Sequence, residues 1–309
     1  MPAEQAVRKY DHLQNAEYNF VPFSQIPQYR DANRSLLRKV VRRLPDNFVH
    51  VDPGSGTGLV AREMIGLLHG EKKGRIICVE PDEYAISQAK DLMPHQSDVE
   101  VIFIQGFAQD LESLVGGYIP DNGVDSVSMH DAIHEIRGRD EKLKALRAEF
   151  NIGKRGAYYT WNSAFTTEGM GEDAMGYGRW IRGAFTESGG RTKRVRDRSD
   201  IVDDKTKIYE PYEYLPLFSE VGFKYLTLNP RTVILTNKAL VAIARYPRFA
   251  EGAYENFEPG EDGRIPSIEK MSADLVKVAI ENKIGPLVRI WNEYTAIKPF
   301  TASRGKAAA

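Results

Sequence analysis

Three glycines at alternate positions, preceded by an acid, form the strongest chemical motif of the chain, Asp52-Pro53-Gly54-Ser55-Gly56-Thr57-Gly58. An apolar run over 48–51 precedes the motif, and apolar residues at helical spacing follow it over 59–68. Because glycine has no Cβ, a strand–glycine turn–helix unit lets the backbone approach a nucleotide-like ligand closely. The alternative interpretation is an ordinary tight turn.

A second acid, Glu80, ends the next predicted strand, 75–80. Its carboxylate can accept two hydrogen bonds from a vicinal diol, whereas it would repel a phosphate group. The alternative for Glu80 is a solvated strand end.

Two histidines four residues apart, His130 and His134, follow the predicted strand 124–129. A histidine with a near-neutral pKa suits general-base work, and Glu135 adjoins His134. Each histidine could instead be a packing or helix-cap residue. The i, i+4 spacing is also that of a metal pair, but no third ligand is evident, and we predict no metal.

Strands alternate with helices through the first half of the chain. The predicted strands are 48–51, 75–80, 99–105, 124–129 and 157–161, and the predicted helices are 31–43, 59–68, 82–91, 110–114 and 130–150. This alternation predicts an α/β fold with a doubly wound, mostly parallel sheet and helices on both faces. Ligands of such sheets bind at the carboxyl ends of the strands, so the residues that follow each strand matter most.

The composition of the 309 residues is that of an ordinary globular protein, with 42% hydrophobic and 28% charged residues. The net charge of −1 gives no electrostatic drive toward nucleic acid. The single cysteine, Cys78, cannot form an intramolecular disulfide and fits a reducing compartment. No signal-peptide core or membrane-length apolar run is present, so we expect a cytoplasmic location and neither a membrane nor a nucleic-acid partner.

Over about residues 30–245, the chain resembles the class I S-adenosylmethionine-dependent methyltransferases. Residues 52–58 resemble the acidic-Gly-x-Gly-x-Gly first motif, and Glu80 resembles the acid that holds the ribose hydroxyls. Residues 105–111 resemble the third-strand motif around adenine, 130–136 the segment after the fourth strand, and 214–223 the late helix and strand.

The resemblance implies a seven-stranded Rossmann-like methyltransferase fold with N-terminal helices, an inserted lid and C-terminal helices. It implies S-adenosylmethionine as the cofactor; the acids Asp52 and Glu80 agree with an adenosine–amino-acid ligand, although they do not exclude NAD. The cofactor contacts that it assigns are Asp52, Gly54, Ser55, Gly56, Thr57, Gly58, Glu80, Pro81, Phe107, Ala108 and His130.

One position departs from the family pattern. Phe107 stands where the family commonly has an aspartate that bonds the adenine amino group. Adenine recognition would then use backbone amides near Ala108, stacking on Phe107, or the side chains of Gln109 or Asp110. Core packing is the alternative role for Phe107.

We divide the chain into five parts. These are a helical cover (1–45), the cofactor-binding core (46–165), an inserted lid or substrate segment (166–208), the end of the core sheet (209–247), and a C-terminal helical extension with a disordered tail (248–309). In the fourth part, a helix at 211–221 precedes 223–235 and 238–246, which could form an antiparallel pair of strands. The insertion is rich in glycine and contains a basic run at 191–198, so we expect it to be mobile.

The leading hypothesis is methyl transfer to a small, partly apolar or aromatic metabolite, at oxygen or carbon. His134 would be the general base, with His130 or Glu135 orienting it or the acceptor. An aromatic set including Trp161, Trp180 and Phe185 could line the acceptor pocket, or could be ordinary core. Alternatives are a cyclase or other non-methylating enzyme that uses the cofactor as a scaffold, and a non-catalytic binding subunit. The expected partner is a small-molecule acceptor, and a homodimer stays open.

Overall fold

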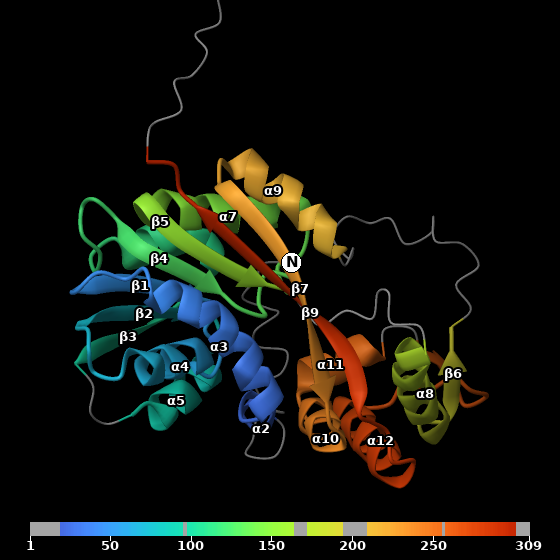
Figure 1. Cartoon of the computed structure of the whole chain (residues 1–309). Coiled ribbons are helices and arrows are strands. Elements are labelled where there is room, and N and C mark those ends of the chain that lie inside the picture. The colour runs from blue at the N-terminus through green and yellow to red at the C-terminus, as the bar shows by residue number, and fades with distance from the viewer. Residues whose placement is uncertain (1–18, 95–97, 164–171, 194–208, 255–256, 301–309) are drawn as a thin grey trace, which may run out of the picture. The chain divides into compact units, whose positions relative to one another are not determined.

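The computed structural model describes residues 19–94, 98–163, 172–193, 209–254 and 257–300 (Figure 1). The chain divides into two compact units. Unit 1 comprises 1–32, 165–201 and 232–291, and unit 2 comprises 33–164, 202–231 and 292–309. We describe each unit by itself.

A seven-stranded sheet has the order β3-β2-β1-β4-β5-β9-β7. Strands β1 to β5 pair in parallel, and β9 pairs antiparallel with β5, with Tyr158 opposite Ile297. Because β1 lies between β2 and β4, the strand order reverses at the carboxyl ends of β1 and β4, where such folds bind ligands. The strands are β1 (Phe48–Pro53), β2 (Gly74–Glu80), β3 (Val99–Gln105), β4 (Val124–Met129), β5 (Gly153–Asn162), β7 (Lys224–Leu235) and β9 (Leu287–Ile297).

Helices cover both faces of this sheet in unit 2, as the sequence predicts. One apolar cluster joins the sheet to α3 and α4, and another joins it to α6, α7 and α9 (Figure 1). The predicted helix at 31–43 begins earlier, at Pro27, which is a favourable residue for a first helical turn. The helices are α3 (Pro27–Val41), α4 (Leu59–Leu68), α5 (Glu83–Leu92), α6 (Leu111–Val115), α7 (Arg139–Ile152) and α9 (Tyr214–Val221).

The segment after β4 differs from the prediction. A helix was expected from His130 to about residue 150, but α7 begins only at Arg139. Asp131 and Gly138 have φ angles of 53° and 77°, and left-handed backbone cannot continue a right-handed helix. His134 therefore lies in an irregular segment, 130–138, and the prediction that it lies one turn into a helix is wrong.

The end of the sheet also differs from the prediction. Residues 238–246 were expected to form a strand paired with 223–235, but α10 (Asn237–Ala244) is a helix capped by Thr236, whose Oγ1 accepts from Ala239 N at 3.4 Å. The partner of β7 is β9, in a region expected to be helical or disordered. Polar residues such as Asn292 and Glu293 interrupt its apolar pattern and hide the strand in the sequence.

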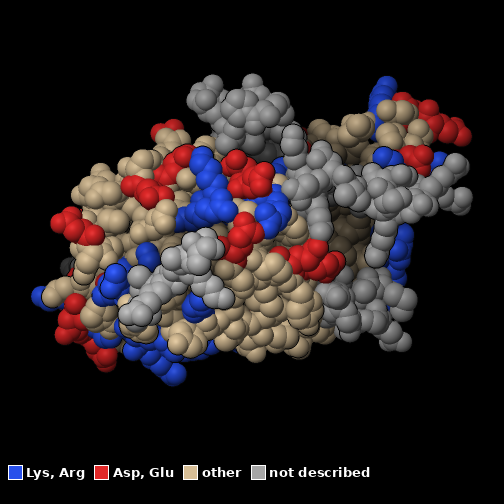
Figure 2. Space-filling view, turned by 90° about the horizontal axis from the view of Figure 1, so that it is seen from above, with Lys and Arg blue, Asp and Glu red and all other residues tan. Residues whose placement is uncertain are grey.

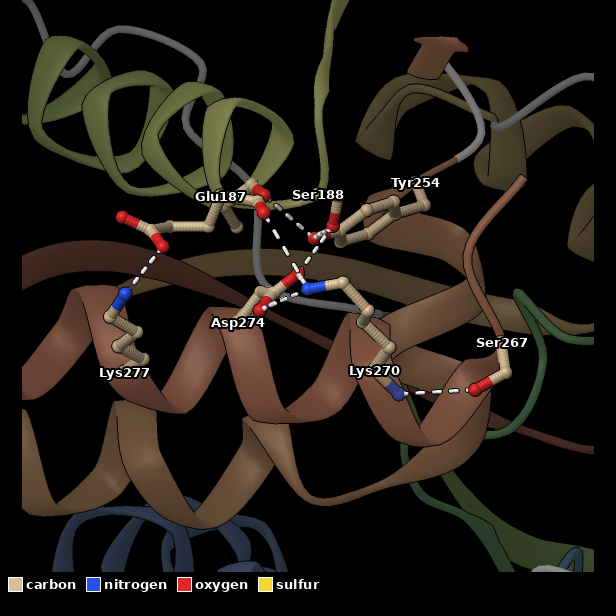
Figure 3. A network of polar contacts seen from close by, with 8 residues as sticks. Glu187, Ser188, Tyr254, Ser267, Lys270, Asp274 and Lys277 are labelled. Atoms are coloured by element: carbon tan, nitrogen blue, oxygen red, sulfur yellow. Dashed lines mark hydrogen bonds and ion pairs between the residues drawn. The ribbon is translucent and has the colours of Figure 1, made fainter. Parts of the chain in front are cut away.

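Unit 1 is mainly helical. Figure 3 shows Ser188 and Lys270 gathered around the buried carboxylate of Asp274. Ser188 Oγ donates to Asp274 Oδ2 at 2.5 Å, and Lys270 Nζ lies 3.0 and 2.8 Å from the two carboxylate oxygens. These contacts compensate the buried charge and join the end of α8 to α12. The elements are α2 (Val21–Ser24), α8 (Glu172–Glu187), β6 (Gly190–Thr192), α10, α11 (Pro247–Ala253), β8 (Phe257–Pro259) and α12 (Ile268–Glu281).

Charged side chains of both signs are interspersed on the face drawn in Figure 2, in keeping with the net charge of −1. Among the described residues, no helix combines the length and the apolar character needed to cross a membrane.

A buried acid on α7 predicts a pH-dependent stability. Glu149 accepts a hydrogen bond from Trp161 Nε1 at 2.7 Å, and burial raises the pKa of Glu149 to about 8 although this hydrogen bond lowers it. The folded state therefore holds a proton on Glu149 that the unfolded state releases near pH 4.5. The contribution of this proton to the stability is fully present below pH 4.5 and is lost as the pH rises through about 8.

Glu149→Gln keeps an acceptor for Trp161 but cannot ionise. The parent should lose stability between pH 6 and pH 9, whereas Glu149→Gln should not. We therefore expect the free energy of unfolding of the variant minus that of the parent to rise by about 1–3 kcal/mol over this range. Urea unfolding at several pH values measures the difference. Glu149→Ala, which removes the acceptor, should be less stable than the parent at acidic pH, and parallel pH profiles of parent and Glu149→Gln would contradict the assignment.

Candidate functional site

The glycine turn lies between β1 and α4 in a conformation that needs glycine. Gly54, Gly56 and Gly58 have φ angles of 69°, 51° and 72°, in the left-handed region that side chains with a Cβ disfavour. Gly54 N donates to Val79 O at 2.8 Å, which fixes the turn to the end of β2. A Cβ added at Gly56 would meet nothing within 4 Å. The turn thus has open space beside its central glycine, Gly56.

Glu80 holds the middle of the turn. Its carboxylate accepts hydrogen bonds from Gly56 N at 2.8 Å and from Asp82 N at 3.1 Å. Both bonds come from backbone amides, and a carboxylate offers about four lone-pair sites in all. Glu80 and Gly56, which were both predicted to contact the cofactor, are therefore hydrogen-bonded neighbours in the structure.

Buried polar atoms surround this arrangement. Asp52 is 1% exposed, and its Oδ2 atom, like Thr57 Oγ1, has no hydrogen-bond partner among the described residues. Burial and the nearby charge of Glu80 raise the pKa of Asp52 well above its usual value. Buried polar atoms normally have partners, so these two atoms mark a place that a polar, cationic ligand would complete.

The end of β3 lies beside the end of β2, because Gly106 N donates to Glu80 O at 3.1 Å. The half-buried Phe107 follows, and the buried Ala108 begins a short 3₁₀ helix. Gln109 donates to Glu141 at 3.1 Å, and Asp110 pairs with Lys144 at 3.4 Å. These two side chains are thus in contact with residues of α7. Pro81, also half-buried, accepts from Gln105 Nε2 at 3.2 Å.

The segment 130–138 packs directly on the glycine turn. A Cβ on Gly54 would lie 2.6 Å from Ala132 Cβ. Asn162, the last residue of β5, accepts a hydrogen bond from Asp131 N, and Ile133 is buried in the core. The structure therefore brings the residues after β1 and β4 together, as the topology requires.

His130 is buried with both ring nitrogens bonded. Nδ1 donates to Asn33 Oδ1 at 2.8 Å, and Nε2 accepts from Thr160 Oγ1 at 2.9 Å, a tautomer fixed by the carbonyl oxygen of Asn33. Burial lowers the pKa of His130 to about 3. This neutral imidazole connects α3 to β5.

His134 has a different environment. Its side chain is 21% exposed, with Nε2 3.3 Å from Glu135 Oε1 and Nδ1 4.0 Å from Asp131 Oδ1. Burial lowers the pKa of His134, but the hydrogen bond and charge of Glu135 and the charge of Asp131 outweigh it, so the pKa is raised above 6.5. The chain therefore contains a His134–Glu135 pair on the segment whose Ala132 packs against the glycine turn.

The aromatic residues considered for an acceptor pocket are largely packed in the two units. Trp161 is buried and stacks on Phe218 at 4.4 Å, whereas Trp180 and Phe185 are buried in unit 1. Phe165 lies outside the described residues, as does most of the basic run. Within the described ranges, no three His, Cys, Asp or Glu side chains are grouped to hold a metal ion.

The sequence analysis did not identify several residues that support the candidate site. Asn162 positions the segment after β4, Asn33 and Thr160 hold His130, and Lys142 contacts the backbone of Ile136. Asn162 follows the rule that residues at strand ends matter. Asn33 carried no such signal, because it lies inside α3.

Comparison with known proteins agrees with this geometry. Residues 51–160 match the family model described as a methyltransferase domain. A search of the curated proteins finds no match to the sequence. Two solved structures share the fold: the [4+2]-cyclase SpnF (TM-score 0.52, 15% identity, 96% of this chain and 97% of that one) and the cyclopropane synthase MmaA2 from Mycobacterium tuberculosis (TM-score 0.50, 12% identity, 96% and 99%).

The predicted Rossmann-like methyltransferase fold is confirmed by the seven-stranded sheet and by these neighbours. The matched region contains the end of β1, strands β2 to β4 and most of β5, with the glycine turn and the segment 130–138. Over residues 51–160, the chain thus matches a methyltransferase domain, in agreement with the resemblance seen in the sequence.

Proposed function

We propose that this chain transfers a methyl group from S-adenosylmethionine to a small, partly apolar or aromatic metabolite, at oxygen or carbon. S-adenosylmethionine is the cofactor of the family and, when bound, supplies a methyl group on a positively charged sulfur. The residues present fit it, because the space at Gly56 is open, the Glu80 carboxylate can accept from a ribose diol, and Asp52 is a buried acid without a hydrogen-bond partner for Oδ2 among the described residues.

The observation that carries the proposal is the His134–Glu135 pair on a segment packed against the glycine turn. A carboxylate that accepts from Nε2–H leaves Nδ1 as the proton acceptor. Nδ1 is buried and has no hydrogen-bond partner among the described residues. His134 would thus remove the acceptor proton, and Glu135 would orient the ring and stabilise its charged form.

His130 supports the site in another way. Its two nitrogens are already bonded to Asn33 and Thr160, and its lowered pKa disfavours a proton. We propose that His130 orients the start of the segment 130–138. Of the two residues considered for orienting His134, Glu135 lies within reach, at 3.3 Å.

Glu80→Ala tests the cofactor site. Losing charged hydrogen bonds should cost about 1.5–3 kcal/mol, which is roughly a ten- to hundredfold loss of affinity. Calorimetry with S-adenosylmethionine measures it, and Glu83→Ala, which removes an exposed acid three residues away, is the control for net charge. Equal affinity of Glu80→Ala and the parent would sink the assignment.

Phe107→Ala tests adenine stacking. We expect cofactor affinity to fall about two- to tenfold because an aromatic contact is lost, while Phe107→Tyr, which keeps the ring, binds like the parent. Excess cofactor should restore most of the thermal stability. A variant that is less stable but binds with unchanged affinity would indicate core packing instead.

The reaction itself is tested by incubating the protein with methyl-labelled S-adenosylmethionine and metabolite extracts, followed by mass spectrometry. A labelled product supports methyl transfer. A rearranged product without label would favour the cyclase alternative, for which SpnF shares the fold, and binding without any product would favour a non-catalytic subunit. A cytoplasmic location, a homodimer and an inserted lid stay predictions, and much of 166–208 lies outside the described residues.

A further inference from the structure

Lys142 is a buried lysine that the proposed reaction does not use. It is 1% exposed on α7, its Nζ donates to the carbonyl oxygen of Ile136, and it lies 4.8 Å from the centre of the Tyr209 ring. Burying an ammonium group costs free energy unless polar partners compensate it, and an apolar side chain would fill a core position at a lower cost. The burial of the Lys142 ammonium group therefore indicates a role other than core packing.

The segment 130–138 is fixed at two ends. At its start, Asn162 accepts from Asp131 N and Ile133 is buried in the core. At its other end, the carbonyl of Ile136 is held by Lys142. His134 and Glu135 lie between these two points, in backbone that forms no helix. The position of their side chains thus depends on the anchor at Ile136.

Tyr209 is the second half of this anchor. Its ring is largely buried, packs edge to face on Tyr214 at 5.6 Å, and presents a face to the ammonium group. A desolvated cation–π contact favours one placement of a flexible lysine side chain. We propose that Lys142 and Tyr209 form a positioning pair that holds the segment 130–138 so that His134 stays in place as the base, an inference that rests on the function proposed for His134.

The charges around His134 give the pair a second effect. Asp131 and Glu135 face it from its own segment, and Lys142 faces it from α7. Arg139, at the start of α7, is instead paired with Glu220. The carboxylates raise the pKa of His134, whereas Lys142 lowers it. Lys142 therefore keeps more of the imidazole in the neutral form that can accept a proton.

The first test does not require activity. NMR titration of the His134 ring in the full chain should show a higher midpoint in Lys142→Met and a nearly unchanged one in Lys142→Arg, which retains the charge. Amide exchange over 131–137 should be about tenfold faster in Lys142→Met. Unchanged titration and exchange in Lys142→Met would overturn the proposal.

Tyr209 offers a matched pair of variants. Tyr209→Phe keeps the ring and should keep turnover within about twofold, whereas Tyr209→Leu removes the cation–π contact and should lower turnover about ten- to hundredfold by misplacing the base. Equal turnover of the two variants would contradict a role for the ring.

A double-variant cycle separates positioning from simple stability. If Lys142 acts through His134, adding Lys142→Met to His134→Ala should cause no further loss of turnover. Additive losses would overturn the proposal. Full turnover of His134→Ala alone would instead refute the assignment of the base, while the titration and exchange measurements would still judge the anchor.

Discussion

His134→Ala is expected to lower kcat by about 10²–10⁴-fold, the usual effect of removing a general base. The affinity for S-adenosylmethionine should stay within about twofold, because His134 lies on the segment after β4, whereas the acids proposed to bind the cofactor, Asp52 and Glu80, lie at the ends of β1 and β2. Single-turnover kinetics with labelled cofactor, together with calorimetry, measure both quantities.

His130→Ala is the informative comparison. It should chiefly lower stability, because it leaves the buried Asn33 and Thr160 without their shared partner. If turnover survives His134→Ala but collapses in a folded His130→Ala, the two roles are reversed. If neither change matters, the enzyme works by alignment alone or transfers no methyl group.

The same assignment fixes the pH dependence. The pKa of His134 is raised above 6.5, and the base acts only when deprotonated. kcat/KM should therefore fall as the pH drops through this raised pKa, with the acid limb lying above pH 6.5. Glu135→Gln should move this limb to lower pH, because the carboxylate that stabilises the imidazolium is gone.

The sequence predicts the first half of the fold closely, because each element there has a strong local signal. β3 and β4 have the predicted bounds, and so does α4, which follows three glycines that no other residue type could replace without strain. β7 was also predicted within a residue or two. These segments combine apolar runs with turn residues at both ends.

The errors lie where tertiary context decides. Residues 238–246 form an apolar run that a strand or a helix can use, and Thr236 as cap together with alanine-rich composition favours the helix α10. β9 is hidden because Glu293 is a buried acid, whose charge is compensated by partners distant in the sequence, chiefly Lys39 at 2.9 Å.

The candidate site was predictable to a similar degree. The residues predicted to contact the cofactor lie at or just after strand ends, and the parallel order brings these strand ends together. The hydrogen bonds of His130 were not predictable, since Asn33 is 97 residues away in the sequence. A pattern of residue types cannot show whether a histidine is solvated, paired with a carboxylate or fully bonded inside the core.

Gly56→Val should abolish cofactor binding, with a loss of affinity above about a hundredfold and larger than that of Glu80→Ala. A Cβ at Gly56 meets no protein atom within 4 Å, so the side chain can enter the open space beside the turn, which the proposal assigns to the cofactor. A β-branched side chain there leaves no room for a ligand against the backbone.

Gly70→Val is the matched control, because Gly70 also has a left-handed backbone, with φ of 73°, and open space around its Cβ position. Both variants should lose about 1–2 kcal/mol of stability through backbone strain. Only Gly56→Val should lose the cofactor, since Gly70 lies in the turn between α4 and the start of β2, whereas Glu80 ends β2. Calorimetry and thermal unfolding of both proteins separate strain from the blocked site, and a Gly56→Val protein that binds S-adenosylmethionine as tightly as Gly70→Val would place the cofactor elsewhere.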